Sequence, residues 1–162
     1  FTVEGIIRAI TRERTKGLGF TVGVLHHAYL RWLDTQKLPQ PSGLRDGWLQ
    51  AERWLYSRRA PGNTCLSALT AANGESFGDA AINDSKGCGD VMRSAPFGLV
   101  TTYEPSDRFA YEMAATAAGY THGHSLASTH PALWREFRHR RQLRQSNPAE
   151  CRRERAAEGC RL

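Results

Sequence analysis

Residues 83–89 read Asn-Asp-Ser-Lys-Gly-Cys-Gly and are the part of the chain best suited to binding a ligand. The two glycines let a ligand approach the backbone closely and allow conformations that other residues avoid. We expect a helix to start near residue 90, and the free N–H groups of a helix start attract phosphate. Asp84 could act as a base or as the partner of a metal-bound water. The residues that could contact a ribose or a phosphate are Asn83, Ser85, Lys86, Gly87 and Gly89.

Taken alone, this loop also has a simpler structural explanation. A glycine-rich segment ahead of a helix is usually an ordinary connection, and a lysine such as Lys86 is usually a solvated surface residue. The spacing G-x-x-x-x-G-K-[ST] of a P-loop is absent from the sequence. The loop residues by themselves therefore leave a phosphate site and an ordinary connection both open.

A second candidate is Thr121-His122-Gly123-His124, at the end of a predicted helix. Two histidines one residue apart could bind a metal ion, yet the sequence offers no clear third ligand nearby. A histidine at a helix C-terminus is also stabilised by the helix dipole, and the residues alone favour that structural role. We interpret His26 and His27, on another predicted helix, as structural residues too.

Four cysteines stand at positions 65, 88, 151 and 160, and no two of them have the C-x-x-C spacing of a zinc site. Their even number is compatible with disulfides. The absence of a secretion signal favours a reducing compartment instead, so we predict free thiols. The sequence contains no run of about 18 apolar residues, so we expect no transmembrane helix. We expect a cytoplasmic protein.

Apolar residues recur three or four positions apart in several segments, and no convincing two-residue alternation occurs, which predicts an all-α fold. The turn at 61–64 can start a helix, because its Asn and Thr side chains accept hydrogen bonds from free N–H groups. Residues 73–90 are predicted to be a loop. The four tryptophans, at positions 32, 48, 54 and 134, are expected in the core. The other predicted helices span residues 1–14, 22–36, 47–59 and 108–118.

The net charge of +6 is concentrated at the C-terminal end of the chain. Residues 131–162 contain 9 arginines and 4 glutamates, a net charge of +5, whereas residues 1–130 carry a net charge of only +1. The basic balance therefore describes the tail and gives little support to nucleic-acid binding by the folded part. A tail that binds nucleic acid stays open as a minor alternative.

Residues 83–99, NDSKGCGDVMRSAPFGL, resemble a motif of the ADP-ribosylglycohydrolase family, whose members carry N-x-S-x-G-[NC]-G, then Met-Arg, then Ala-Pro-x-Gly. The segment at 121–124 matches another part of the family. The motifs follow in the family's order, and the resemblance covers about residues 1–124. Three further segments are similar to the bacterial branch: FTVEGIIRA at 1–9, HHAYLRWLDTQ at 26–36 and APGNTCLSAL at 60–69.

The resemblance implies an ADP-ribosylglycohydrolase-like helical bundle, incomplete here, with two Mg²⁺ ions as the family's cofactors. It implies hydrolysis of the bond between ADP-ribose and a protein side chain, or of related linkages. The partner would then be ADP-ribose or an ADP-ribosylated protein. Carried over by position, His122 would lie near the ligand. The residues that would contact the diphosphate, largely through their backbone, are Ser85, Lys86, Gly87, Cys88 and Gly89.

The sequence departs from the family at both ends, and we expect a chain truncated at both. The family's first metal motif, Thr/Ser-Asp-Asp, lies immediately upstream of the segment that matches residues 1–9. Its second, Asp-x-Asp-Thr/Ser, comes late, whereas residues 125–162 contain no aspartate. Asp79, Asp84 and Asp90 alone cannot rebuild the site, because Mg²⁺ needs several oxygen ligands in near-octahedral order. No residue of this chain is therefore assigned as a metal ligand.

These observations divide the chain into a partial ADP-ribosylglycohydrolase-like helical domain, residues 1–124, and a divergent Arg-rich tail, residues 125–162. The abrupt change in composition suggests the hypothesis that the tail is translated out of frame. We expect a hydrolase fragment with little turnover and assign no catalytic residue. A non-catalytic module that binds ADP-ribose is the alternative.

Overall fold

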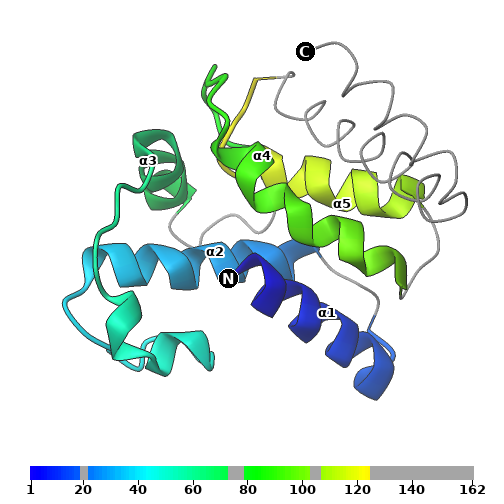
Figure 1. Cartoon of the computed structure of the whole chain (residues 1–162), viewed down its shortest axis with the longest axis horizontal. Helices are drawn as coiled ribbons and strands as arrows, with labels where there is room; N and C mark the ends of the chain where they lie inside the picture. Colours follow the sequence, from blue (N-terminus) through cyan, green and yellow to red (C-terminus); the bar gives the residue numbers. More distant parts are fainter. Residues whose placement is uncertain (19–21, 73–78, 103–106, 125–162) are drawn as a thin grey trace, which may run out of the picture.

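The structure, a computed structural model, describes residues 1–18, 22–72, 79–102 and 107–124. All regular elements within these residues are helices, which confirms the predicted all-α fold (Figure 1). None of the described helices is long and apolar enough to cross a membrane. The α-helices are α1 (Thr2–Lys16), α2 (Val22–Lys37), α3 (Asn63–Ala72), α4 (Gly89–Ser94) and α5 (Asp107–Gly119), and the 3-10 helices are η1 (Leu49–Ala51), η2 (Arg53–Leu55) and η3 (Ala95–Thr102).

The hydrophobic core lies between the pair α1–α2 and the segment that runs from α4 through η3 to α5. Figure 1 shows α4 and α5 next to each other above one end of α2, and α3 above its other end. α3 contributes one large buried side chain, Leu69, to this core. The buried core residues are Ile6, Leu25, Tyr29, Leu30, Leu33, Leu69, Phe97, Ala114, Ala117 and Tyr120.

Two glycines set the length and the packing of α1. Gly17 ends the helix with a left-handed φ of 63°, and its N–H donates to the carbonyl of Glu13 at 2.9 Å. Gly5 faces α2, where a Cβ would lie only 3.0 Å from Ala28 Cβ and from Leu25 Cδ2. The absence of a side chain at this position therefore lets α1 and α2 pack closely.

Four predicted helix positions agree with the structure. The segments 1–14, 22–36 and 108–118 correspond to α1, α2 and α5, each within two residues at either end. The turn at 61–64 starts α3, as its Asn and Thr predict. These segments agree because their apolar residues are spaced for one buried helix face.

The helix predicted over residues 47–59 is wrong. Two separate 3-10 helices, η1 and η2, occupy this stretch, and Glu52 between them is extended, with φ −78° and ψ 99°. Trp48 and Trp54, expected in the core, are 50% and 63% exposed. Trp32 does pack against the core, and Trp134 lies outside the described residues.

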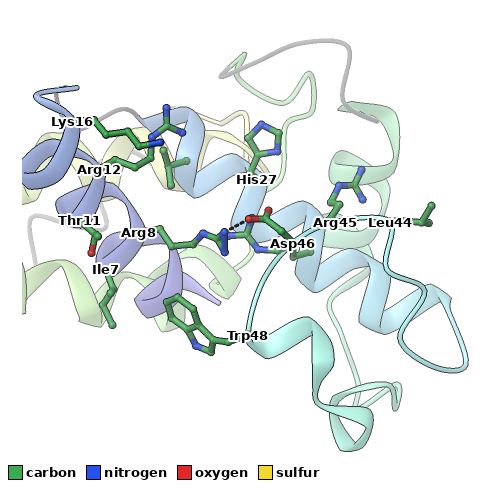
Figure 2. A pocket seen from close by; sticks show the side chains of 12 residues that line it. Ile7, Arg8, Thr11, Arg12, Lys16, His27, Leu44, Arg45, Asp46 and Trp48 are labelled. Carbon is green, nitrogen blue, oxygen red and sulfur yellow. Dashed lines mark hydrogen bonds and ion pairs between the residues drawn. The ribbon is translucent and has the colours of Figure 1, made fainter.

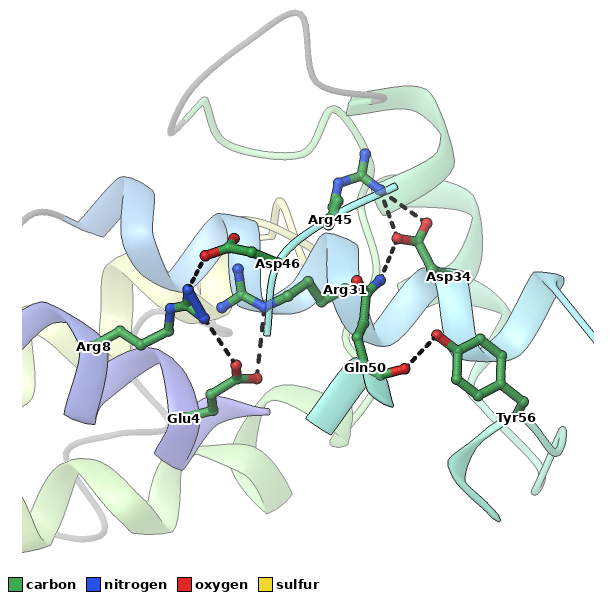
Figure 3. Close-up of polar contacts among 8 residues, drawn as sticks. All are labelled: Glu4, Arg8, Arg31, Asp34, Arg45, Asp46, Gln50 and Tyr56. Carbon is green, nitrogen blue, oxygen red and sulfur yellow. Dashed lines mark hydrogen bonds and ion pairs between the residues drawn. The ribbon is translucent and has the colours of Figure 1, made fainter. Parts of the chain in front are cut away.

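Polar contacts hold this stretch in place instead of apolar burial. Gln50 is buried, and its side chain donates to Asp34 of α2 at 2.7 Å. The carbonyl of Gln50 accepts a hydrogen bond from the Tyr56 hydroxyl at 2.9 Å (Figure 3). Arg45 donates to both carboxylate oxygens of Asp34, at 2.9 and 2.8 Å. The helix prediction failed because these hydrogen bonds give the segment a stable alternative.

A buried carboxylate joins α1 to α2. Glu4 is almost fully buried, and its oxygens lie 3.3 Å from Arg8 Nη1 and 3.6 Å from Arg31 Nε (Figure 3). Arg8 also pairs with Asp46, from the loop after α2. Burial lowers the pKa of Arg31, and the Glu4 carboxylate opposes that shift. Because an unpaired buried charge is strongly destabilising, these contacts fix the relative positions of the two helices.

Substitution of Leu25 by Ala tests the core. The Leu25 side chain has no exposed surface, so its removal should lower the free energy of unfolding by about 2–5 kcal/mol. Ile82→Ala is the matched control, because Ile82 is fully exposed and its loss should cost less than about 0.5 kcal/mol. Urea denaturation followed by circular dichroism measures both, and equal effects would contradict this core.

A second prediction concerns pH. Burial lowers the pKa of His26, and the nearby His27 and Arg45 lower it further. The unfolded chain, with a histidine pKa of about 6.5, therefore binds a proton more readily than the folded one. Stability should decrease as the pH falls below about 6.5. Replacement of His26 by Gln should flatten the dependence of the melting temperature on pH, and an unchanged slope would contradict this assignment.

Candidate functional site

A cavity of about 520 Å³ opens between α2, α3 and the loop that precedes α4. Gly87, Cys88, Gly89 and His122 line it, so four of the seven candidate ligand-binding residues meet at one place. Much of the remaining wall is apolar or aromatic, and it contains one partly buried cation, Arg93. The other lining residues are Phe1, Thr2, Tyr29, Trp32, Ala60, Gly62, Thr64, Cys65, Leu69 and Met92.

The ring of His122 forms the floor beneath the two glycines. His122 is 3% exposed. A Cβ on Gly87 would lie 3.4 Å from His122 Nε2, and one on Gly89 would lie 3.5 Å from His122 Cε1. Nδ1 of the ring is 2.8 Å from the Thr121 hydroxyl, which fixes the ring orientation. The loop backbone thus packs directly on an imidazole that reaches the cavity.

Asn83 joins the loop to the segment after α5. Its side-chain NH₂ donates to the carbonyl of Thr121 at 3.0 Å. Its side-chain oxygen accepts hydrogen bonds from the backbone N–H groups of Ser85 and Gly123, both at 3.1 Å. Since Asn83 makes these three bonds within the protein and does not line the cavity, its place in the structure is that of a positioning residue.

Ser85 stabilises the turn from below. Its hydroxyl accepts a hydrogen bond from the N–H of Gly87 at 3.3 Å and lies 3.1 Å from the hydroxyl of Thr64, at the start of α3. From the sequence, Thr64 has a role at the start of a helix but none in the site, because the 21-residue separation from Ser85 hides the contact. The APGNTCLSAL segment and the glycine loop are therefore parts of one site.

Arg93 is a site residue that the sequence reasoning missed. Its guanidinium donates to the sulfur of Cys65 at 3.4 Å and to the carbonyl of Ala117 at 3.3 Å, and it also bonds to the Thr121 hydroxyl. It lies 4.8 Å from the ring centroid of Tyr29. Arg93 lies in the Met-Arg pair of the family-like motif, which was the available signal.

Two candidate groups lie away from the cavity. Lys86 is exposed and does not line it. The Asp84 side chain is 86% exposed and lies 3.6 Å from His124 Nε2. Neither the Asp84 carboxylate nor the Lys86 ammonium group therefore lines the cavity beside His122.

The helix start behind the loop is shorter than a strong phosphate site requires. α4 does begin near residue 90, as predicted, but it is only six residues long and continues into η3. A helix this short adds little dipole. Any attraction for phosphate must therefore come mainly from the loop N–H groups and from the cation of Arg93.

The acidic residues near the site do not form a metal centre. Among the described residues, no three His, Cys, Asp or Glu side chains lie together as a metal site would need. Asp90 is buried and Asp84 is exposed, so they face different surroundings. The donor set of the described residues therefore does not fit the two Mg²⁺ ions that the resemblance implies.

The geometry describes a helical protein with a glycine loop closed over a buried histidine at the edge of a mostly apolar cavity. The family model for ADP-ribosylglycohydrolase matches residues 1–139. The chain therefore belongs to the ADP-ribosylglycohydrolase family of hydrolases, which act on ADP-ribosylated substrates and generally bind metal ions, and the resemblance drawn from its motifs is confirmed. No curated protein and no solved structure matches the chain.

Several expectations stay predictions. The family match extends beyond residue 124, while residues 125–162 lie outside the described residues, so the tail boundary and its out-of-frame origin are untested. The cytoplasmic location is untested as well. Cys65 and Cys88 are both free, and the other two cysteines lie in the tail.

Gly123→Ala tests the close approach that shapes the loop. A Cβ at this position would overlap the carbonyl oxygens of Ala81 and Asn83 and lie 3.0 Å from the Asn83 nitrogen. Overpacking of this kind should destabilise the protein by about 1–3 kcal/mol. Gly98→Ala is the control, because its Cβ would meet nothing within 4 Å. Thermal melts of both variants decide, and a harmless Gly123→Ala would exclude this loop geometry.

Proposed function

We propose that this chain binds ADP-ribose in the 520 Å³ cavity and, on its own, releases little ADP-ribose from modified proteins. The observation that supports binding is the meeting of Gly87, Gly89 and the His122 ring at the edge of the cavity. Membership of a family that acts on ADP-ribosylated substrates gives the ligand class.

The lining of the cavity suits the two chemical halves of ADP-ribose. The Arg93 guanidinium favours a diphosphate, together with backbone N–H groups of the glycine turn other than that of Gly87, which donates to Ser85. The aromatic and apolar wall, with Tyr29 and Trp32, favours a flat base. His122 can exchange a hydrogen bond with a ribose hydroxyl through Nε2, since Nδ1 is already beside Thr121.

The low turnover follows from the donor set. Hydrolysis of an ADP-ribose linkage needs a positioned water and a group that accepts its proton. No carboxylate lines the cavity, and the described residues hold no cluster of metal-binding side chains. We therefore propose binding as the main activity of this chain, with His122 as a contact residue and not as a catalyst.

Isothermal calorimetry with ADP-ribose, without added metal, tests the binding. The parent chain should bind, and Gly87→Val should weaken binding about tenfold or more, because two added methyl groups would meet the His122 ring or fill the space for the diphosphate. Gly98→Val, at a position outside the cavity where a Cβ would meet nothing within 4 Å, should bind as the parent does. Absence of heat from the parent at millimolar ligand would exclude the proposal.

A release assay on ADP-ribosylated arginine and serine peptides with Mg²⁺ tests the second half of the proposal. We expect no release above the uncatalysed rate, since no carboxylate lines the cavity and the described residues hold no cluster of metal-binding side chains. Clear release would show that low turnover is wrong while leaving binding intact. Binding that instead falls steeply with salt and disappears on removal of residues 131–162 would favour the basic tail as a nucleic-acid binder.

A further inference from the structure

A second cavity, of about 820 Å³, lies between α1, the α2 residues His27 and Arg31, and the loop after α2 (Figure 2). We call it the basic groove. Its lining contains five lysine or arginine side chains and a single carboxylate, that of Asp46. The lining residues are Ile7, Arg8, Thr11, Arg12, Lys16, Val24, His27, Arg31, Leu44, Arg45, Asp46 and Trp48.

Three of the five cations already have carboxylate partners. Arg8 pairs with Asp46 and Glu4, Arg31 pairs with Glu4, and Arg45 pairs with Asp34 (Figure 3). These contacts account for every carboxylate that faces the groove. The other two cations of the groove have none of these carboxylates as partners.

Arg12 and Lys16 have no carboxylate of the described residues within ion-pair distance. Together with Arg8 they stand four residues apart along α1, which places all three on one side of the helix. Like charges at this spacing repel each other and weaken a helix. An anion between them would remove that repulsion.

The histidine in the groove reports the same excess charge. His27 has a lowered pKa, first because of its partial burial and then because of the neighbouring Arg31, Arg45 and Arg12, although Asp46 opposes them. A neutral imidazole in a cationic surrounding can still exchange a hydrogen bond with an anion. The groove therefore combines fixed cations with a neutral polar group.

We propose that the basic groove is a second ligand site, which binds a compact anion carrying several phosphate groups through Arg12, Lys16 and the outer face of Arg8. An arginine guanidinium can bond two phosphate oxygens at once, and a lysine ammonium adds a point charge. The cations lie within about 12 Å along α1, two turns of helix, so one small ligand can contact all of them. A nucleic-acid strand would need a longer basic track than this single cavity offers.

This site is separate from the ADP-ribose cavity. The two cavities have no lining residue in common. His27 and Arg31 line the groove, whereas Tyr29 and Trp32 line the other cavity. Residues two apart in a helix point in directions about 160° apart, so the two cavities lie on opposite faces of α2. Loss of one site should leave the other unchanged.

Calorimetry with inorganic tripolyphosphate at low ionic strength tests the proposal on the full chain. The double variant Arg12→Gln/Lys16→Gln should weaken binding about tenfold or more. The matched control Lys37→Gln/Arg58→Gln removes the same two charges from exposed positions outside the groove and should bind as the parent does. Both double variants should bind ADP-ribose equally well, which separates this test from that of the first cavity.

A second readout follows the groove directly. Addition of tripolyphosphate should move the His27 ring signals in NMR, because a bound anion would offset the surrounding cations and raise the His27 pKa. The ring signals of His124, which lies beside Asp84 and outside the groove, should stay in place. Equal weakening in both double variants would overturn the proposal, as would binding of an oligonucleotide or an acidic peptide without binding of tripolyphosphate.

Discussion

No side chain fits between residue 123 and the backbone of the loop before α4, and the candidate site depends on that close approach. Because Gly123 leaves this space, the amide of Asn83 can bond both to the loop and to the segment after α5. His122 lies between these bonds and is held under the glycines. The shape of the glycine loop is thus imposed by a residue about 40 positions away, and not by the glycines alone.

Arg93 adds the charge that this arrangement lacks. Its guanidinium bonds to carbonyls in the last turn of α5, where the partial negative charge of the helix end stabilises a cation. It also contacts the sulfur of Cys65 in α3 and faces the ring of Tyr29 in α2. A single partly buried cation therefore joins α4 to three other helices and presents positive charge to the cavity. Such a charge is costly to bury without partners, so its several contacts are a condition for its presence there.

Residue types and spacing predicted the parts of the structure that depend on local sequence. α1, α2 and α5 follow from apolar periodicity, and the loop follows from its glycines. The segment around Trp48 and Trp54 has a similar apolar spacing, yet it forms no α-helix, and the hydrogen bond from Gln50 to Asp34 of α2 stabilises its actual conformation. Contacts such as Thr64 with Ser85 link residues far apart in the chain, and periodicity carries no signal for them. Single-sequence reasoning therefore located the loop, including Asn83 and Ser85, but not the contacts that hold it in place.

α2 illustrates why one apolar stripe gives an incomplete description of a helix. Leu25 and Leu33 point into the core, while Tyr29 reaches one cavity and Arg31 reaches the other. Coupling between the two cavities would need an element with two alternative arrangements. α1 and α2, which both line the groove, pack closely at Gly5, where even a methyl group would meet its neighbours at 3.0 Å. Since no lining residue belongs to both cavities, we expect their ligands to bind independently of each other.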